Sequence, residues 1–150
     1  MLELIDETFA TRQDPGQIQV TQAQMKKLQN IHEATLSELA NDDGPLIWVL
    51  LIPTTKLIMD DFLSGKISET ELLKNTTPEE KYDCIYLCSA TALPKARKKG
   101  DTKKLCIKAI KSISKDHNIK TLFVWPFSQE GLLLAKGIAE ECKMELLVKT

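Results

Sequence analysis

Residues 93–102 combine the residue types that bind a phosphate group. The segment reads Leu-Pro-Lys-Ala-Arg-Lys-Lys-Gly-Asp-Thr, with four basic side chains and one glycine. It follows an apolar run typical of a strand, residues 82–92, and precedes apolar residues at helical spacing from Leu105 onward. The start of a helix has backbone N–H groups without acceptors and a partial positive charge, and a phosphate satisfies both. The segment therefore predicts a phosphate-binding turn in which Gly100 allows close approach to the backbone.

The charge distribution favours a local anion site over a general nucleic-acid interface. Ten basic and two acidic residues lie between Lys95 and Lys120, whereas the whole chain has a net charge of −1. Nucleic-acid-binding domains are usually basic as a whole, so we do not expect nucleic acid as a partner. The lysines of the helix that follows the turn are expected to form a solvated face; they are Lys103, Lys104, Lys108, Lys111 and Lys115.

The elements that position this turn follow from hydrophobic spacing, caps and turn residues. We expect strands at 46–52 (stopped by Pro53), 82–92, 121–125 and 144–148, and helices at 21–40, after Thr54 or Thr55, from Ser68, from Thr77, from about 102 to a cap at Asn118, and from Ser128. Single helices between the later strands imply parallel pairing through crossovers. The sequence therefore predicts an α/β fold with a mixed sheet and helices on both faces.

Composition limits the class of protein. The 150 residues, 43% of them hydrophobic, fit one domain spanning 1–150 with a sizeable core. The longest apolar run, Leu46–Ile52, is too short to cross a membrane, and the acidic start of the chain lacks the features of a secretory signal. Four cysteines without a Cys-x-x-Cys pair, and only two histidines, predict reduced thiols in a cytoplasmic protein and no metal site.

The turn resembles the motif of the GNAT superfamily of N-acetyltransferases. In that family a strand leads into Arg/Gln-x-x-Gly-x-Gly/Ala, and here Arg97-Lys98-Lys99-Gly100-Asp101-Thr102 stands in that place, preceded by Leu93-Pro94. The resemblance covers about residues 82–148, and residues 1–81 match loosely. It implies a mainly antiparallel mixed sheet with a central splayed pair of parallel strands and helices on both faces.

The resemblance also implies a cosubstrate and a reaction. Acetyl-CoA would lie between the splayed strands, with its pyrophosphate on the backbone N–H groups of Arg97, Lys98, Lys99, Gly100, Asp101 and Thr102. Ala92 and Leu93 would pair with the pantetheine, and the Leu93 N–H would reach the thioester oxygen. An amine acceptor would attack the thioester directly, so catalysis would consist mainly of positioning and polarisation.

The catalytic residues are left open. Asp101 and Thr102 depart from the family pattern, and neither Tyr82 nor Tyr86 can supply the tyrosine acid that the family often carries on its last helix. Candidate bases for the amine are Asp60, Asp61, Glu79, Glu80 and Glu130, and residues 125–127 (Trp-Pro-Phe) are candidates to line an acceptor cleft. The departures keep a second hypothesis open, a non-catalytic module that binds CoA or a protein partner. Because the family's final hairpin is short or missing here, a second copy in a homodimer could complete the site.

Overall fold

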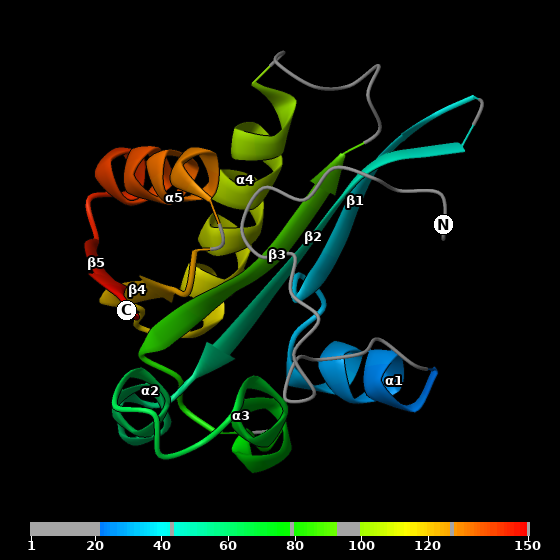
Figure 1. Cartoon of the computed structure of the whole chain (residues 1–150). Coiled ribbons are helices and arrows are strands. Elements are labelled where there is room, and N and C mark those ends of the chain that lie inside the picture. Colours follow the sequence, from blue (N-terminus) through cyan, green and yellow to red (C-terminus); the bar gives the residue numbers. More distant parts are fainter. Residues whose placement is uncertain (1–21, 43, 79, 93–99, 127, 150) are drawn as a thin grey trace.

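The computed structural model describes residues 22–42, 44–78, 80–92, 100–126 and 128–149. Within these residues the chain forms an α/β fold with a five-stranded mixed sheet, ordered β1-β2-β3-β4-β5 (Figure 1). The elements in chain order are α1 (Gln22–Ile31), β1 (Leu36–Asn41), β2 (Gly44–Thr54), α2 (Lys56–Leu63), α3 (Glu69–Asn75), β3 (Cys84–Ala92), α4 (Asp101–Asp116), β4 (Thr121–Val124), α5 (Gln129–Cys142) and β5 (Glu145–Val148).

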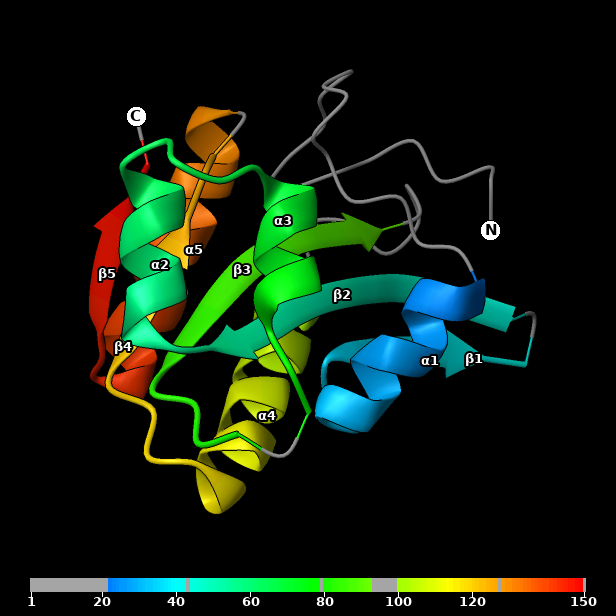
Figure 2. The ribbon, with the colours of Figure 1, turned by 90° about the horizontal axis from the view of Figure 1, so that it is seen from below.

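The sheet combines antiparallel and parallel pairing. β1 with β2 and β2 with β3 are antiparallel and form the longer ladders, whereas β3 with β4 and β4 with β5 are parallel. The mixed sheet and the parallel crossovers expected from the sequence are confirmed. Helices α4 and α5, which make the two crossovers, cover one face of the sheet, and α2 and α3 cover the other (Figure 2).

Local caps define the starts of three helices, as the sequence predicts. The Thr55 side chain accepts a hydrogen bond from the Ile58 N–H and begins α2. Ser68 forms a capping box with Glu71 at the start of α3. Ser128 accepts from the Gly131 N–H at the start of α5. Each cap satisfies an N–H group that the first turn of a helix would otherwise leave without a partner.

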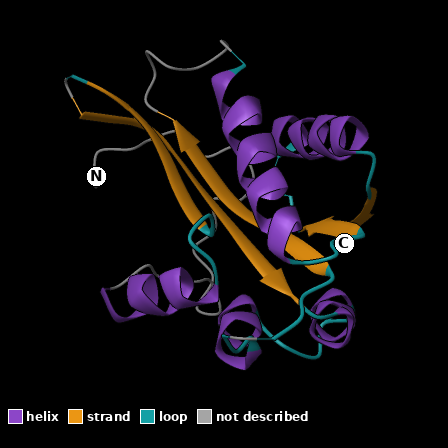
Figure 3. Cartoon of the chain, turned by 180° about the vertical axis from the view of Figure 1, so that it is seen from behind, coloured by secondary structure: helices purple, strands orange, loops and turns teal. Residues whose placement is uncertain are grey.

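The helix predicted over residues 21–40 is wrong in its second half. Helix α1 ends at Ile31, and Leu36–Asn41 forms strand β1 instead. β1 pairs with β2 from Leu36↔Leu50 to Asn41↔Gly44 in a hairpin that projects beyond the helices (Figure 3). Residues 36–41 have helical spacing in the sequence, but their pairing with β2 determines their conformation. Spacing and propensity along the chain carry no information about such a contact.

Three predicted boundaries also need correction. Pro53 does not stop β2, which continues to Thr54 with Pro53 opposite Ile85. Thr77 opens no helix in the described residues; the carbonyl of Thr77 accepts from the Tyr82 hydroxyl, and the chain continues into β3. Helix α4 ends at Asp116 with an extended cap residue, His117, rather than at a left-handed Asn118.

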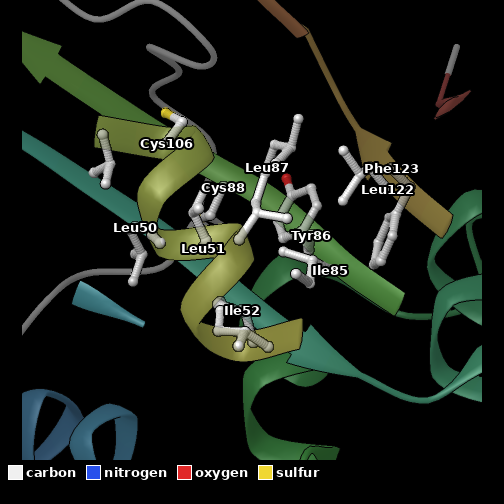
Figure 4. Packing of buried hydrophobic residues seen from close by; sticks show 14 of the residues in the cluster. Leu50, Leu51, Ile52, Ile85, Tyr86, Leu87, Cys88, Cys106, Leu122 and Phe123 are labelled. Carbon is white, nitrogen blue, oxygen red and sulfur yellow. The ribbon is translucent and has the colours of Figure 1, made fainter. Parts of the chain in front are cut away.

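The core fills both sides of the central strands (Figure 4). Toward α2, the Phe62, Tyr86 and Phe123 rings pack together, with Phe62 centroids 4.9 Å from Tyr86 and 6.0 Å from Phe123. Toward α4, four residues of the expected apolar stripe are buried, namely Cys106, Ala109, Ile110 and Ile113. Ile107 is buried as well, whereas Leu105, which was expected in the stripe, is half-buried. The sheet is therefore held between two apolar layers, which fixes the positions of its strand ends.

Candidate functional site

The parallel strands β3 and β4 separate partway along β3. Their pairing runs from Cys84↔Thr121 to Leu87↔Val124, and β3 then continues beside β2 to Ala92. Directly after Leu87 the register with β2 shifts, because Leu51 opposes Leu87 and Leu50 opposes Ser89. Cys88 is thus an extra residue, and such a bulge bends and twists a strand. From this point β3 and the chain that follows β4 run in different directions (Figure 1).

Helix α4 begins at Asp101, and its N-cap residue, Gly100, offers no side chain to cap it. Gly100 has φ +74°, in the left-handed region that favours glycine. Lys104 N–H donates to the Gly100 carbonyl at 3.1 Å, so the amides of residues 101–103 precede the first intrahelical bond. Gly100 is exposed, and apart from its chain neighbours no atom of the described residues lies within 4 Å of the position that a Cβ would take. This end of α4 can accept an anion, while Asp101 in the first turn already supplies one negative charge.

The structure describes half of the residues that the sequence predicts for the cofactor. Ala92 ends β3 opposite Ile47, and Gly100, Asp101 and Thr102 form the start of α4. The other four, Leu93, Arg97, Lys98 and Lys99, lie outside the described residues. Four of the five lysines predicted to form a solvated face on α4 are exposed, namely Lys104, Lys108, Lys111 and Lys115. The fifth, Lys103, is half-buried beside Gly137 of α5.

A pocket of about 330 Å³ lies on the α2–α3 face, next to the ends of β4 and β5. Its aromatic walls are Phe62 from α2 and Trp125, one residue after β4. Four charged residues also line the pocket. Lys66 lies between α2 and α3, Glu69 and Glu71 belong to α3, and Lys149 follows β5. Trp125 therefore lines a pocket, whereas Phe127 lies outside the described residues.

Glu69 connects this pocket to the bulge in β3. The residue is 2% exposed, and its Oε1 accepts a hydrogen bond of 2.9 Å from the Cys88 thiol. Glu69 is the first residue of α3, where the helix dipole favours a negative charge. A carboxyl group is rarely buried unless it has partners and a role that requires its position. The arrangement places a carboxyl group where the two parallel strands separate.

Sequence reasoning missed Glu69 and chose other carboxylates. Neither Asp60, Asp61, Glu80 nor Glu130 lines the pocket, and Glu79 lies outside the described residues. Asp60 instead pairs with Lys56 at 2.9 Å on an exposed surface of α2. The sequence does contain a signal for Glu69: once Ser68 is taken as the N-cap, the residue lies three and four positions before Leu72 and Leu73. That spacing puts it on their buried face.

A second polar cluster joins α1 and α4 away from the pocket. His32 Nε2 lies 2.7 Å from Asp116 Oδ2, and His32 Nδ1 accepts from the Ala34 N–H at 3.0 Å. Because Nδ1 accepts a hydrogen bond, Nε2 must carry the ring proton, and the Nε2–H group donates a hydrogen bond to Asp116. The neighbouring His117 ring packs against Tyr82 at 4.6 Å, and burial, followed by the proximity of His32, lowers the pKa of His117. The cluster ties the ends of two helices together, and no group of three or more metal-ligating side chains occurs in the described part of the chain.

Two of the thiols are unsuited to nucleophilic chemistry. Burial, followed by the charge of Asp83, raises the pKa of Cys84 to about 12. Burial likewise raises the pKa of Cys106 to about 12. Because the thiolate is the reactive form, both side chains are unreactive at neutral pH. No disulfide links the four cysteines, all of which lie in described residues.

The chain matches no family model, no curated protein and no solved structure in the comparisons made with known proteins. In the described part of the chain, no helix combines the length and the apolar character needed to span a bilayer.

Proposed function

We propose that the protein is an acyl-CoA-dependent N-acyltransferase with a GNAT-like fold, which transfers an acetyl group from acetyl-CoA to an amine. One observation carries the proposal: β3 and β4 are parallel and separate at a bulge, with an uncapped helix N-terminus beyond one strand and a charged pocket beside the other. A thioester bound between the strands would reach the α2–α3 face next to that pocket. The motif at residues 97–102 supports the same assignment.

The donor would be held mainly by its charge. The pyrophosphate of CoA would accept hydrogen bonds from the amides at the start of α4, where the helix dipole and nearby Lys103 and Lys104 favour an anion. Gly100 leaves open space at this end, so the diphosphate could approach the backbone. Ala92 and Leu93 would pair with the pantetheine, as the resemblance implies.

The acceptor amine would attack the carbonyl carbon of the thioester directly. A C–N bond forms, the C–S bond breaks, and CoA leaves as a thiolate that takes a proton from water. An acceptor that arrives as an ammonium ion first loses one proton to water, because only the neutral amine has the lone pair that attacks. The amine nitrogen loses a second proton during the attack, and we propose Glu69 as the acceptor of that proton because the residue is buried and lines the pocket next to the bulge. A carboxylate at this place contributes by proton transfer, and the rest of the rate comes from positioning.

Isothermal titration with acetyl-CoA and with free CoA tests donor binding. Gly100→Ala adds a Cβ at the helix start and should weaken acetyl-CoA binding at least about tenfold, which corresponds to ~1.4 kcal/mol. Gly65→Ala is the control for backbone strain, because Gly65 also has a positive φ, +86°. Gly65 lines the pocket on the α2–α3 face and not the start of α4, so this variant leaves the proposed pyrophosphate contacts in place. Both variants should lose similar stability. Equal acetyl-CoA affinities for the two variants, or no binding by the native chain, would refute the donor site.

A non-catalytic CoA-binding module is the second candidate, and Asp101 is the observation that favours it. Its carboxylate occupies the first turn of α4 and competes with a phosphate for the same end of the helix. Asp101→Asn should therefore tighten acetyl-CoA binding. Release of CoA thiol, followed with a panel of amines, separates the two candidates. An enzyme releases thiol and loses this activity in Glu69→Gln without losing donor affinity, whereas a binding module binds the donor and releases none.

A further inference from the structure

Lys149 places its ammonium group in a corner formed by two aromatic rings. The Lys149 backbone N–H donates to the Val124 carbonyl at 2.9 Å, which holds this residue beside the end of β4. Its Nζ lies 5.0 Å from the Trp125 ring centroid and 5.7 Å from the Phe62 centroid. The two rings are 5.9 Å apart with an interplanar angle of 76°. A single cation thus contacts two ring faces that meet nearly at right angles.

The geometry points to a binding site for the ammonium group of a small alkylamine, a site that Lys149 itself occupies when no ligand is bound. The inference deepens the proposed function, on which it rests for the identification of the bound amine as the acyl acceptor. The binding itself requires no acyl-CoA.

The chemistry of the pocket selects a cation. Aromatic faces attract an ammonium group electrostatically, and the attraction is stronger where the group is shielded from water. Two carboxylates, Glu69 and Glu71, line the same pocket, and Glu69 is buried. Once the Lys149 side chain has left the corner, Lys66 is the one basic residue that remains among the described residues of the lining, so the carboxylates outnumber it. An anionic ligand would meet these charges, and a neutral one would gain nothing from them. The volume of about 330 Å³ is at the lower end of small-molecule sites, which fits a short amine.

Lys149 can leave the corner because only its main chain is anchored by a hydrogen bond that the structure shows. Its ammonium group is at the end of a flexible four-carbon stem and is half-buried. The ion pairs that the structure shows among the described residues do not include Lys149. A tethered group competes with a ligand at the high local concentration that its short linker imposes. Only molecules in which Lys149 has left the corner can bind the amine. The apparent affinity therefore equals the intrinsic affinity multiplied by the fraction of such molecules. Removing the side chain should expose the site.

The test is a titration of the full chain with n-butylamine hydrochloride at neutral pH, without acyl-CoA. The indole N–H signal of Trp125 is followed by NMR and is assigned by its persistence in Trp48→Phe. Lys149→Ala should bind n-butylammonium at least about threefold more tightly than the native chain, since the tethered competitor is gone. Lys149→Arg keeps a cation and should stay as weak as the native chain. Lys111→Ala, an exposed lysine of α4, is the matched control and should change nothing.

The titration is repeated with n-butanol, which has a similar shape but no charge, and with potassium chloride, which matches the ionic strength. Neither compound should shift the Trp125 signal as n-butylamine does. The inference is overturned if Lys149→Ala binds no more tightly than the native chain, if Lys111→Ala gains as much, or if n-butanol binds equally well. Because acetyl-CoA is absent, failure here leaves the donor titration untouched. Failure of donor binding likewise leaves the amine site standing.

Discussion

Replacing Thr76 by valine should destabilise the protein about twice as much as replacing Thr54 by valine. The two hydroxyl oxygens lie 2.7 Å apart, and both residues are fully buried between β2 and the end of α3. Thr76 Oγ1 also donates to the Leu72 carbonyl at 2.8 Å. A hydroxyl has one proton to donate, so the Thr54 hydroxyl must be the donor in the pair. Thr76 therefore takes part in two hydrogen bonds and Thr54 in one of them, so the two substitutions should lower the stability by different amounts.

The magnitudes follow from the bonds that each change removes. Thr54→Val removes one buried hydrogen bond and should lower the free energy of unfolding by about 1 kcal/mol. Thr76→Val removes two and leaves the Thr54 hydroxyl without its acceptor, so the loss should be about 2–3 kcal/mol. The double variant leaves neither hydroxyl behind, and its loss should be smaller than the sum of the single losses.

Urea unfolding followed by circular dichroism measures these differences, with the m-value expected to stay constant. In thermal unfolding, each kcal/mol corresponds to about 2–4 °C for a chain of this size. Equal losses in the two single variants, or strict additivity in the double variant, would refute the assigned direction of the hydrogen bonds. The pair matters for the site because it fixes the end of α3, the helix that carries Glu69, against the sheet.

Three further predictions concern titration, reactivity and capping. Burial and then His32 lower the pKa of His117 below its ordinary value of 6.5, so protonation favours unfolding and stability falls as the pH drops below about 6.5. His117→Gln should reduce the drop in Tm between pH 7.5 and 5, and an unchanged drop would contradict it. Iodoacetamide at pH 8 should alkylate half-buried Cys142 well before Cys106, because burial raises the pKa of Cys106 to about 12. Peptide mass spectrometry measures the order of modification, and early modification of Cys106 would show that the packing of α4 is wrong. Ser128→Ala should cost about 1 kcal/mol in urea unfolding because α5 loses its N-cap, and a change within about 0.3 kcal/mol would argue against that cap.

The features that could be predicted from the sequence are those set by neighbouring residues. The caps at Thr55, Ser68 and Ser128 are local, so spacing alone identified the starts of three helices. The parallel crossovers also followed, because they depend on the order of elements rather than on contacts. Strand β1 could not be predicted in this way, because its conformation depends on pairing with β2 across a hairpin.

The site was harder to predict because its residues come from distant parts of the chain. Glu69 was missed because the prior that acidic side chains are exposed outweighed the helical spacing that buries it. The aromatic corner around Lys149 depends on the contact of Phe62 with Trp125, from helix α2 and the end of β4, which no local pattern encodes. The predicted pyrophosphate contact of Gly100 depends on a ligand and stays a prediction.

The extra residue in β3 reverses the in-and-out alternation of its side chains. Tyr86 faces α2, so Leu87 faces the opposite layer, and Cys88 returns to the α3 side. Ser89 opposes the β2 residue next to the one opposite Leu87, which places Ser89 on the same side as Cys88. Odd-numbered positions therefore point to one layer before the bulge and to the other layer after it. Both layers are apolar, so the bulge decides which layer a side chain packs against: an odd-numbered residue of β3 faces the α4 side before the bulge and the α2–α3 side after it.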